Sequence, residues 1–284
     1  MNYREHLKNK NRIVVKIGSS SLTHPETGRL NLDRMEKLVR VLTNINNQGK
    51  DVILVSSGSI AVGRTALSLK EKPSTLTMKQ ACAAVGQARL MMVYQKLFAE
   101  YNQICAQILM TKDTMINDCS RTNARNTFDK LLEMNVIPIV NANDTVSTEE
   151  LNFSDNDTLS SIVTALVDGD LLIILSDIDG FCTDDPNKNS KAKLISCVEN
   201  INDDMFDMAK ASTGADVGTG GMKTKIFAGK IVTSFGADMV ICNGNDVENI
   251  NYILDGKEIG TLFKSNKNGD FNLLDYISPN NKTY

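Results

Sequence analysis

The chain has 284 residues, a length typical of one large α/β domain or of two fused lobes. Its 31 basic and 34 acidic side chains give a net charge of −3, which argues against a nucleic-acid-binding protein held by bulk charge. No apolar run approaches the roughly 20 residues of a membrane-spanning helix, and residues 1–12 are polar and charged, unlike a secretory signal. We therefore expect a cytoplasmic protein that binds neither nucleic acid nor membrane.

The scarcity of cysteine pairs and histidines restricts the possible chemistry. The six cysteines are dispersed and form no CxxC pair, so we expect free thiols and no zinc site. His6 and His24, the two histidines, both lie near the N-terminus, which argues against histidine-based catalysis and excludes an HExxH metal site. An enzyme with this sequence would have to use lysines, carboxylates, backbone amides or a bound metal.

Apolar runs alternate with amphipathic stretches along most of the chain. Strands are predicted at residues 12–17, 51–56, 104–110, 136–140, 171–176 and 238–242. Helices are predicted at residues 32–47, 78–101, 123–134, 157–166 and 222–235. This alternation favours an α/β fold with a mostly parallel sheet covered on both faces. We expect two lobes that share this sheet, with a boundary near 169–171, a less regular stretch at 177–219 and a short polar tail at 266–284.

The first two strands end in turns suited to an anion. Lys16 lies inside an apolar strand, where an ammonium is costly unless it meets an anion, although it could also reach water from a frayed strand end. Gly18 follows and allows a sharp turn. After the second strand come Ser57 and Gly58 and then a helix start, which suits either an anion site or a serine-capped turn. No Walker A motif is present.

Polar residues also follow the later strands. Asp144 comes just after the strand at 136–140, and Asn156 and Asp157 come just before a helix; such residues are also ordinary caps and turn formers. Ser176 and Asp177 end the strand at 171–176, in a pattern that matches no EF-hand loop and that we interpret as a turn beside a nucleotide.

A glycine-rich turn leads into the helix predicted at 222–235. Its glycines allow close approach to phosphates, its amides are donors, and its lysines bring positive charge. The residues that we expect to contact a nucleotide here are Thr219, Gly220, Gly221, Met222, Lys223, Thr224 and Lys225.

Two lysines and several glycine turns with no histidine base suit phosphoryl transfer, in which positioning and charge neutralisation carry the rate. An acceptor that is itself a carboxylate is already ionised at neutral pH and needs no general base.

These motifs resemble the amino acid kinase family, and within it the members that phosphorylate glutamate. The similarity runs over 12–263, nearly the whole chain. It rests on the order and spacing of VVKIGSSSLT (14–23), VSSGSIAVG (55–63), AAVGQ (83–87), NARNT (123–127), PIVNANDTV (138–146), SDNDTLS (154–160), LSDIDGF (175–181) and GTGGMKTK (218–225).

The resemblance implies a three-layer αβα sandwich with a mainly parallel central sheet. The kinase domain would span 1–265, with a glutamate-binding lobe at about 1–170 and an ATP-binding lobe at about 171–265. The implied reaction moves the γ-phosphoryl group of ATP, with Mg²⁺, to the γ-carboxylate of L-glutamate, as the first step of proline biosynthesis.

The resemblance also implies a role for each matching residue. Lys16 and Lys225 would stabilise the moving phosphoryl group, and Asp157 would hold both lysines. Gly18 and Gly58 would give amides to the phosphates.

The remaining matches concern the two substrates. Ser57, Asp144 and Asn156 would bind glutamate. Ser176 and Asp177, with residues 219–225, would contact ATP. No side chain is implied as a direct metal ligand.

Some family features differ here. We expect no C-terminal PUA domain, and Ala142 stands where the family often has Glu, so one polar contact near the substrate would be missing or replaced. We expect inhibition by proline at the glutamate site, a homodimer or tetramer, and possible contact with the next enzyme of the pathway.

Other interpretations stay open from the sequence. The same lysines and glycines would serve an acetylglutamate kinase, an aspartokinase or a uridylate kinase, and only the NANDTV and SDNDTLS segments favour a free amino acid. A non-catalytic nucleotide or amino-acid sensor on the same fold is a further alternative. A Rossmann oxidoreductase is disfavoured because no GxGxxG follows the first strand.

Overall fold

A computed structural model of the chain describes residues 3–146, 155–184, 188–212 and 221–277. Within these residues the strands are β1 Arg12–Ile17, β2 Asp51–Ser56, β3 Cys105–Met110, β4 Ile137–Ala142, β5 Leu171–Ser176, β6 Cys197–Val198, β7 Asp238–Asn243 and β8 Thr261–Phe263. The α-helices are α1 Ser19–Leu22, α2 Leu32–Asn47, α3 Ser59–Ala66, α4 Leu76–Ala99, α5 Lys112–Ile116, α6 Asp118–Glu133, α7 Asn156–Leu166, α8 Asp203–Ser212, α9 Met222–Phe235, α10 Asn249–Leu254 and α11 Leu273–Ile277, and a 3-10 turn η1 covers Glu5–Asn9.

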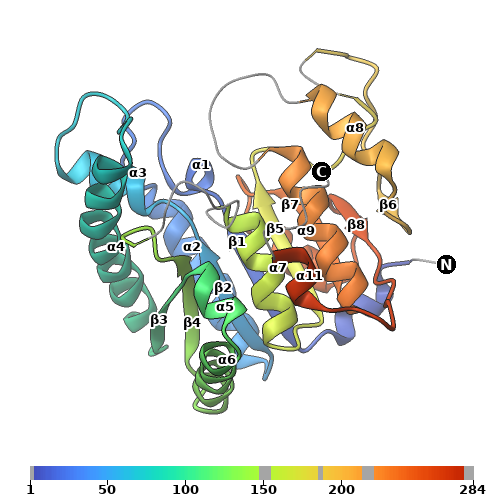
Figure 1. Cartoon of the computed structure of the whole chain (residues 1–284), viewed down its shortest axis with the longest axis horizontal. Coiled ribbons are helices and arrows are strands. Elements are labelled where there is room, and N and C mark those ends of the chain that lie inside the picture. The colour runs from blue at the N-terminus through green and yellow to red at the C-terminus, as the bar shows by residue number, and fades with distance from the viewer. Residues whose placement is uncertain (1–2, 147–154, 185–187, 213–220, 278–284) are drawn as a thin grey trace.

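The strands form one twisted sheet in the order β3-β4-β2-β1-β5-β7-β8-β6 (Figure 1). Pairing is parallel from β3 to β7, and β8 turns antiparallel to β7. The parallel strands therefore all end at the same edge of the sheet, and loops at that edge can meet over a ligand.

Two apolar layers cover the sheet, one on each face. Ile13, Val15 and Ile17 of β1 belong to the layer that includes α2 and α4 residues, whereas Val14 belongs to the layer built with α6, α7 and α9. Since side chains alternate along a strand, Lys16 points to the same side as Val14 and therefore towards α7. The structure confirms the predicted three-layer α/β fold with its mainly parallel sheet.

The predicted elements occur in the expected order, with shifted ends. The helix predicted at 78–101 begins earlier, at Leu76, because the Thr75 side chain caps it by accepting from the Met78 N–H. In the same way, Asn117 caps α6, which begins at Asp118 instead of the predicted residue 123. The stretch expected to be less regular contains β6 and α8, which are too short or too weakly patterned for periodicity to reveal.

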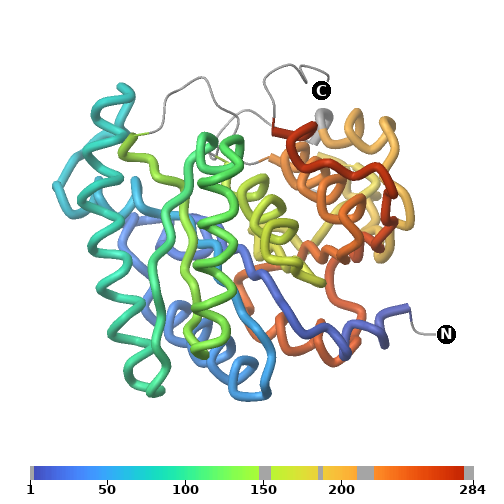
Figure 2. Tube along the Cα trace, turned by 60° about the horizontal axis from the view of Figure 1, so that its bottom comes forward, coloured from blue at the N-terminus to red at the C-terminus, as the bar shows by residue number. Residues whose placement is uncertain are grey.

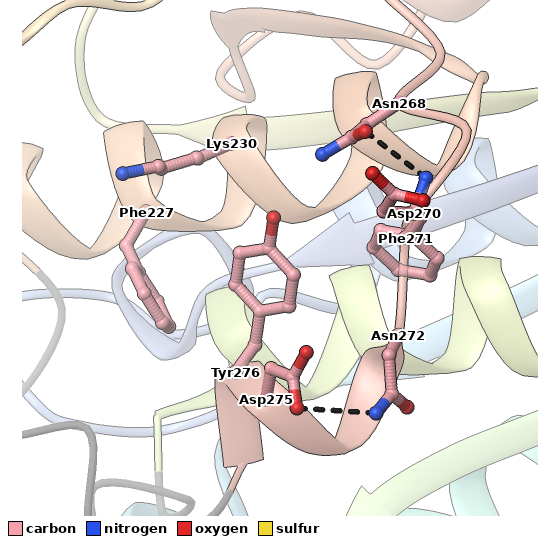
Figure 3. A pocket seen from close by; sticks show the side chains of 8 residues that line it. All are labelled: Phe227, Lys230, Asn268, Asp270, Phe271, Asn272, Asp275 and Tyr276. Atoms are coloured by element: carbon pink, nitrogen blue, oxygen red, sulfur yellow. Dashed lines mark hydrogen bonds between the residues drawn. The ribbon is translucent and has the colours of Figure 1, made fainter.

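The C-terminal residues run back along α9, as the red segment beside the orange helix in Figure 2 shows. Phe271 packs edge-on against Phe235 of α9 with ring centroids 5.7 Å apart, and Ile277 is buried. A pocket opens between α9 and this segment (Figure 3), lined by Phe227, Lys230, Asn268, Asp270, Phe271, Asn272, Asp275 and Tyr276. None of the site residues expected from the sequence lines it.

No helix in the described part of the chain combines the length and apolar character needed to cross a membrane.

Helices α3 and α4 cross with their backbones in contact. A Cβ atom added to Gly63 would lie 1.8 Å from the Cys82 carbonyl oxygen, and one added to Gly86 would lie 1.8 Å from the Ser59 carbonyl oxygen. Ser59 is the first residue of α3, which follows β2, so this crossing fixes the helix that begins beside the end of that strand.

We predict that Gly86→Ala lowers the free energy of unfolding by about 3 kcal/mol, since the added methyl meets rigid backbone and overpacking costs about 1–3 kcal/mol or more. Gly269→Ala is the matched control, because its added Cβ would have nothing within 4 Å, and we expect a change of at most about 0.5 kcal/mol. Urea unfolding of the three proteins checks both values. Equal free energies of unfolding for the two variants would contradict the close backbone contact between α3 and α4.

Candidate active site

One buried carboxylate joins the two lysines expected from the sequence. Asp157, at the start of α7, is fully buried. The Lys16 ammonium from β1 lies 2.5 Å from its Oδ1 atom, and the Lys225 ammonium from the first turn of α9 lies 3.0 Å from its Oδ2 atom. The structure thus brings together Lys16, Asp157 and Lys225 from three distant parts of the sequence.

Two lysines and two carboxyl groups set the electrostatics of this cluster. Burial alone would raise the pKa of Asp157, but the nearby Lys16 and Lys225 outweigh burial and hold that pKa below its usual value. Asp155 caps α7 by accepting from the N–H groups of Asp157 and Thr158. Burial, followed by the charge of Asp157, raises the pKa of Asp155. Both ammonium groups therefore contact Asp157, the carboxyl whose pKa is lowered.

Glycines stand at the start of three helices that follow the strand ends or the glycine-rich turn. Gly18, Gly58 and Gly221 are the N-caps of α1, α3 and α9, and none of them supplies a side-chain cap. Gly58 has a φ of +105°, a left-handed conformation that favours glycine. A Cβ atom at Gly18 would lie 3.8 Å from the Lys16 Nζ atom. Uncapped amides near an ammonium are well suited to phosphate oxygens.

Two of the residues expected to bind an amino acid, Ser57 and Asp144, follow β2 and β4, and the third, Asn156, begins α7. The Asn156 side-chain NH₂ donates to the Ser57 hydroxyl over 2.8 Å, so these two residues are in direct contact. Asp144 accepts from the Ser59 hydroxyl of α3 over 3.1 Å, and burial raises the pKa of Asp144. Since Asn156 and Asp157 are consecutive, this polar cluster adjoins the lysines.

The residues expected to contact a nucleotide are partly described. Ser176 ends β5, is buried, and its hydroxyl donates to the exposed Asp177 carboxylate over 3.0 Å. The Thr224 hydroxyl lies 3.2 Å from Asp157 Oδ2, and Met222 and Lys223 are half-buried in the first turn of α9. Thr219 and Gly220 lie outside the described residues.

Three residues of the site have no individual role predicted from the sequence. Asp155 looks like an ordinary turn former, and Gln87 and Asn141 stand inside family motifs without an implied role. The structure shows that Gln87 and Asn141 are buried and hydrogen-bonded to each other. For Gln87 the available signal is an amide side chain on the inward-facing side of a helix. Ala142, where the resemblance led us to expect a changed contact, lies in the apolar layer on the α7 side of the sheet.

Clustered metal ligands are absent from the described part of the chain. No group of three or more His, Cys, Asp or Glu residues is placed there to hold a metal ion.

Comparison with known proteins gives consistent results. Residues 11–243 match the model of the Amino acid kinase family. The glutamate 5-kinase of Carboxydothermus hydrogenoformans is 53% identical over 264 residues, covering 93% of this chain and 70% of the relative. The glutamate 5-kinase of Clostridium perfringens is 50% identical over 268 residues, covering 93% of this chain and 99% of the relative. The glutamate 5-kinase of Enterococcus faecalis is 48% identical over 264 residues, covering 92% of this chain and 97% of the relative.

Solved structures agree on the architecture. The UMP kinase from Ureaplasma parvum superimposes with a TM-score of 0.63 at 15% identity, over 90% of this chain and 99% of that one. The isopentenyl phosphate kinase substrate complex superimposes with a TM-score of 0.59 at 17% identity, over 89% of this chain and 100% of that one. At such identities the likeness establishes the fold alone. Together with the family match over residues 11–243 and the glutamate 5-kinase relatives, it shows that the chain belongs to the amino acid kinase family.

Proposed function

We propose that this protein transfers the γ-phosphoryl group of ATP to the γ-carboxylate of L-glutamate, giving L-glutamyl 5-phosphate for proline biosynthesis. The observation that carries the proposal is the meeting of Lys16 and Lys225 on Asp157, beside the polar cluster of Ser57 and Asn156. The curated relatives at 48–53% identity, all named glutamate 5-kinase, support the choice of acceptor.

The two lysines would act on the charge that develops during transfer. As the bond between the β,γ-bridging oxygen and the γ-phosphorus breaks, negative charge spreads over the γ-phosphoryl oxygens and the leaving ADP. Lys16 and Lys225 would neutralise this charge from preset positions, because Asp157 holds both ammonium groups before ATP arrives. Amides at Gly18 and Gly58 would bind further phosphate oxygens.

The acceptor would need no catalytic base. The γ-carboxylate of glutamate is ionised at neutral pH and attacks phosphorus directly, so no proton has to be removed. Ser57, Asp144 and Asn156 would bind the polar groups of glutamate and set the distance between its carboxylate and the γ-phosphate. This chemistry agrees with a site assembled from lysines, carboxylates and amides.

The ATP side would include Ser176, Asp177 and residues 219–225. We propose that Mg²⁺ enters with ATP as part of its phosphate complex, because Asp157 is already engaged by two lysines. When bound, the ion would offset phosphate charge.

Three further expectations depend on the same assignment. We propose that proline inhibits by occupying the glutamate site, that the protein forms a homodimer or tetramer, and that it works in the cytoplasm. An acyl phosphate is reactive towards water, which would favour transfer to the next enzyme of the pathway.

The acceptor can be tested directly. We predict ATP-dependent hydroxamate formation when hydroxylamine traps the product made from L-glutamate. N-acetylglutamate and aspartate should give little hydroxamate, and UMP should not increase ADP release above the rate without acceptor. Turnover of another acceptor at a higher kcat/KM than glutamate would contradict the proposal, and nucleotide binding without any turnover would favour a sensor.

The role of the lysine pair can be tested by Lys225→Met. We predict a fall in kcat of about 10²–10³-fold, the loss typical of removing one preset charge-stabilising group, with glutamate binding largely kept. Lys230→Met on the same helix is the matched control, because Lys230 lines the pocket of Figure 3, and it should keep the kcat of the unmodified protein. Steady-state kinetics and glutamate calorimetry measure the two effects. A Lys225→Met enzyme that is folded and fully active would rule out this role.

A further inference from the structure

A chain of three side-chain amides connects α4 to the proposed glutamate site. The Asn141 NH₂ group donates to Gln87 Oε1 over 2.9 Å, and the Asn156 NH₂ group donates to Asn141 Oδ1 over 3.1 Å. Gln87 is 8% exposed and Asn141 is 2% exposed, so water does not compete freely for these bonds. The three amides thus run in one direction, oxygen to NH₂, from the helix to the site.

A backbone N–H group determines the orientation of the Asn141 amide. Asn141 Oδ1 also accepts from the backbone N–H of Ala142 over 2.9 Å, and a backbone N–H can only donate. The Asn141 oxygen must therefore stay on that side, which turns its NH₂ group towards Gln87. The carboxamide oxygen of Gln87 is the buried acceptor that satisfies this NH₂ group.

The row of hydrogen-bonded amides ends in a hydrogen-bond acceptor, the side-chain oxygen of Asn156. The Asn156 NH₂ group is engaged by Asn141 Oδ1 and by the Ser57 hydroxyl, so its Oδ1 atom points the other way. This oxygen is buried, and no described residue donates a hydrogen bond to it. A buried acceptor needs a donor, and the only donor that ionised L-glutamate offers is its α-ammonium group, because both of its carboxylates are acceptors.

We propose that Gln87 is a positioning residue for substrate selection: through Asn141 it holds the Asn156 amide with its oxygen towards the α-ammonium group of the amino acid. This inference rests on the proposed function and adds the group of the substrate that Asn156 recognises. Loss of the Gln87 oxygen would leave the buried Asn141 NH₂ group without an acceptor. Only the Ala142 N–H would then hold the Asn141 amide in place, and the Asn156 oxygen would be held less firmly towards the ammonium.

Gln87→Met and Gln87→Glu form a matched pair. Methionine fills a similar volume without an acceptor, whereas glutamate keeps an oxygen for the Asn141 NH₂ group. The ligands are L-glutamate and glutarate, which has the same two carboxylates and no ammonium group, and calorimetry gives both dissociation constants without requiring turnover.

We expect Gln87→Met to weaken glutamate binding by about five- to fiftyfold while leaving glutarate binding within about twofold, in line with loss of one buried hydrogen bond. Gln87→Glu should restore the preference for glutamate. A packing role alone would weaken both ligands equally, and that result, or failure of Gln87→Glu to restore the preference, would overturn the inference.

Asn141→Ala interrupts the row of amides one residue nearer the site, and it replaces Gln87→Met as the test if that variant does not fold. It should weaken glutamate binding and leave glutarate binding largely unchanged. An equal loss of affinity for both ligands would count against the inference. Glutamate that binds the unmodified protein without being phosphorylated would contradict the proposed function alone. Failure of the unmodified protein to bind glutamate would overturn this inference as well.

Discussion

The structure depends on one ion cluster, Asp157 held between Lys16 and Lys225. Charged side chains that are almost completely buried are costly unless they are paired, and here each ammonium has a separate oxygen of the same carboxylate. The pairing positions both lysines, since one carboxylate contacts both ammonium groups. Two ammonium groups held close together suit an anion that arrives at the carboxyl edge of the sheet.

The fold explains why residues so far apart in the sequence meet. Parallel pairing aligns the ends of β1, β2, β4 and β5 at one edge. Helix α7 lies on one face of the sheet, begins beside the end of β2 and packs against α9. The alternation of side chains in β1 turns Lys16 towards α7. The tight crossing of α3 and α4 fixes the other side of the site, where Ser59 contacts Asp144 and where Gln87 reaches Asn141.

Much of this arrangement follows from sequence patterns, and some of it does not. Apolar runs and amphipathic spacing predict the central strands and long helices, and the rule that ligands bind at the carboxyl ends of parallel strands places Lys16, Ser57 and Asp144 near one another. Local patterns do not show which buried polar groups pair across the sheet. The partnership of Gln87 with Asn141 joins positions 54 residues apart, and β6 is only two residues long.

The most direct measurement is an experimental structure of this protein with L-glutamate and a non-hydrolysable ATP analogue. The account predicts that the Lys16 and Lys225 ammonium groups both lie within hydrogen-bond distance of γ-phosphate oxygens while Asp157 still contacts both. A γ-phosphate bound away from either lysine, with the glutamate γ-carboxylate out of reach of its phosphorus, would contradict it.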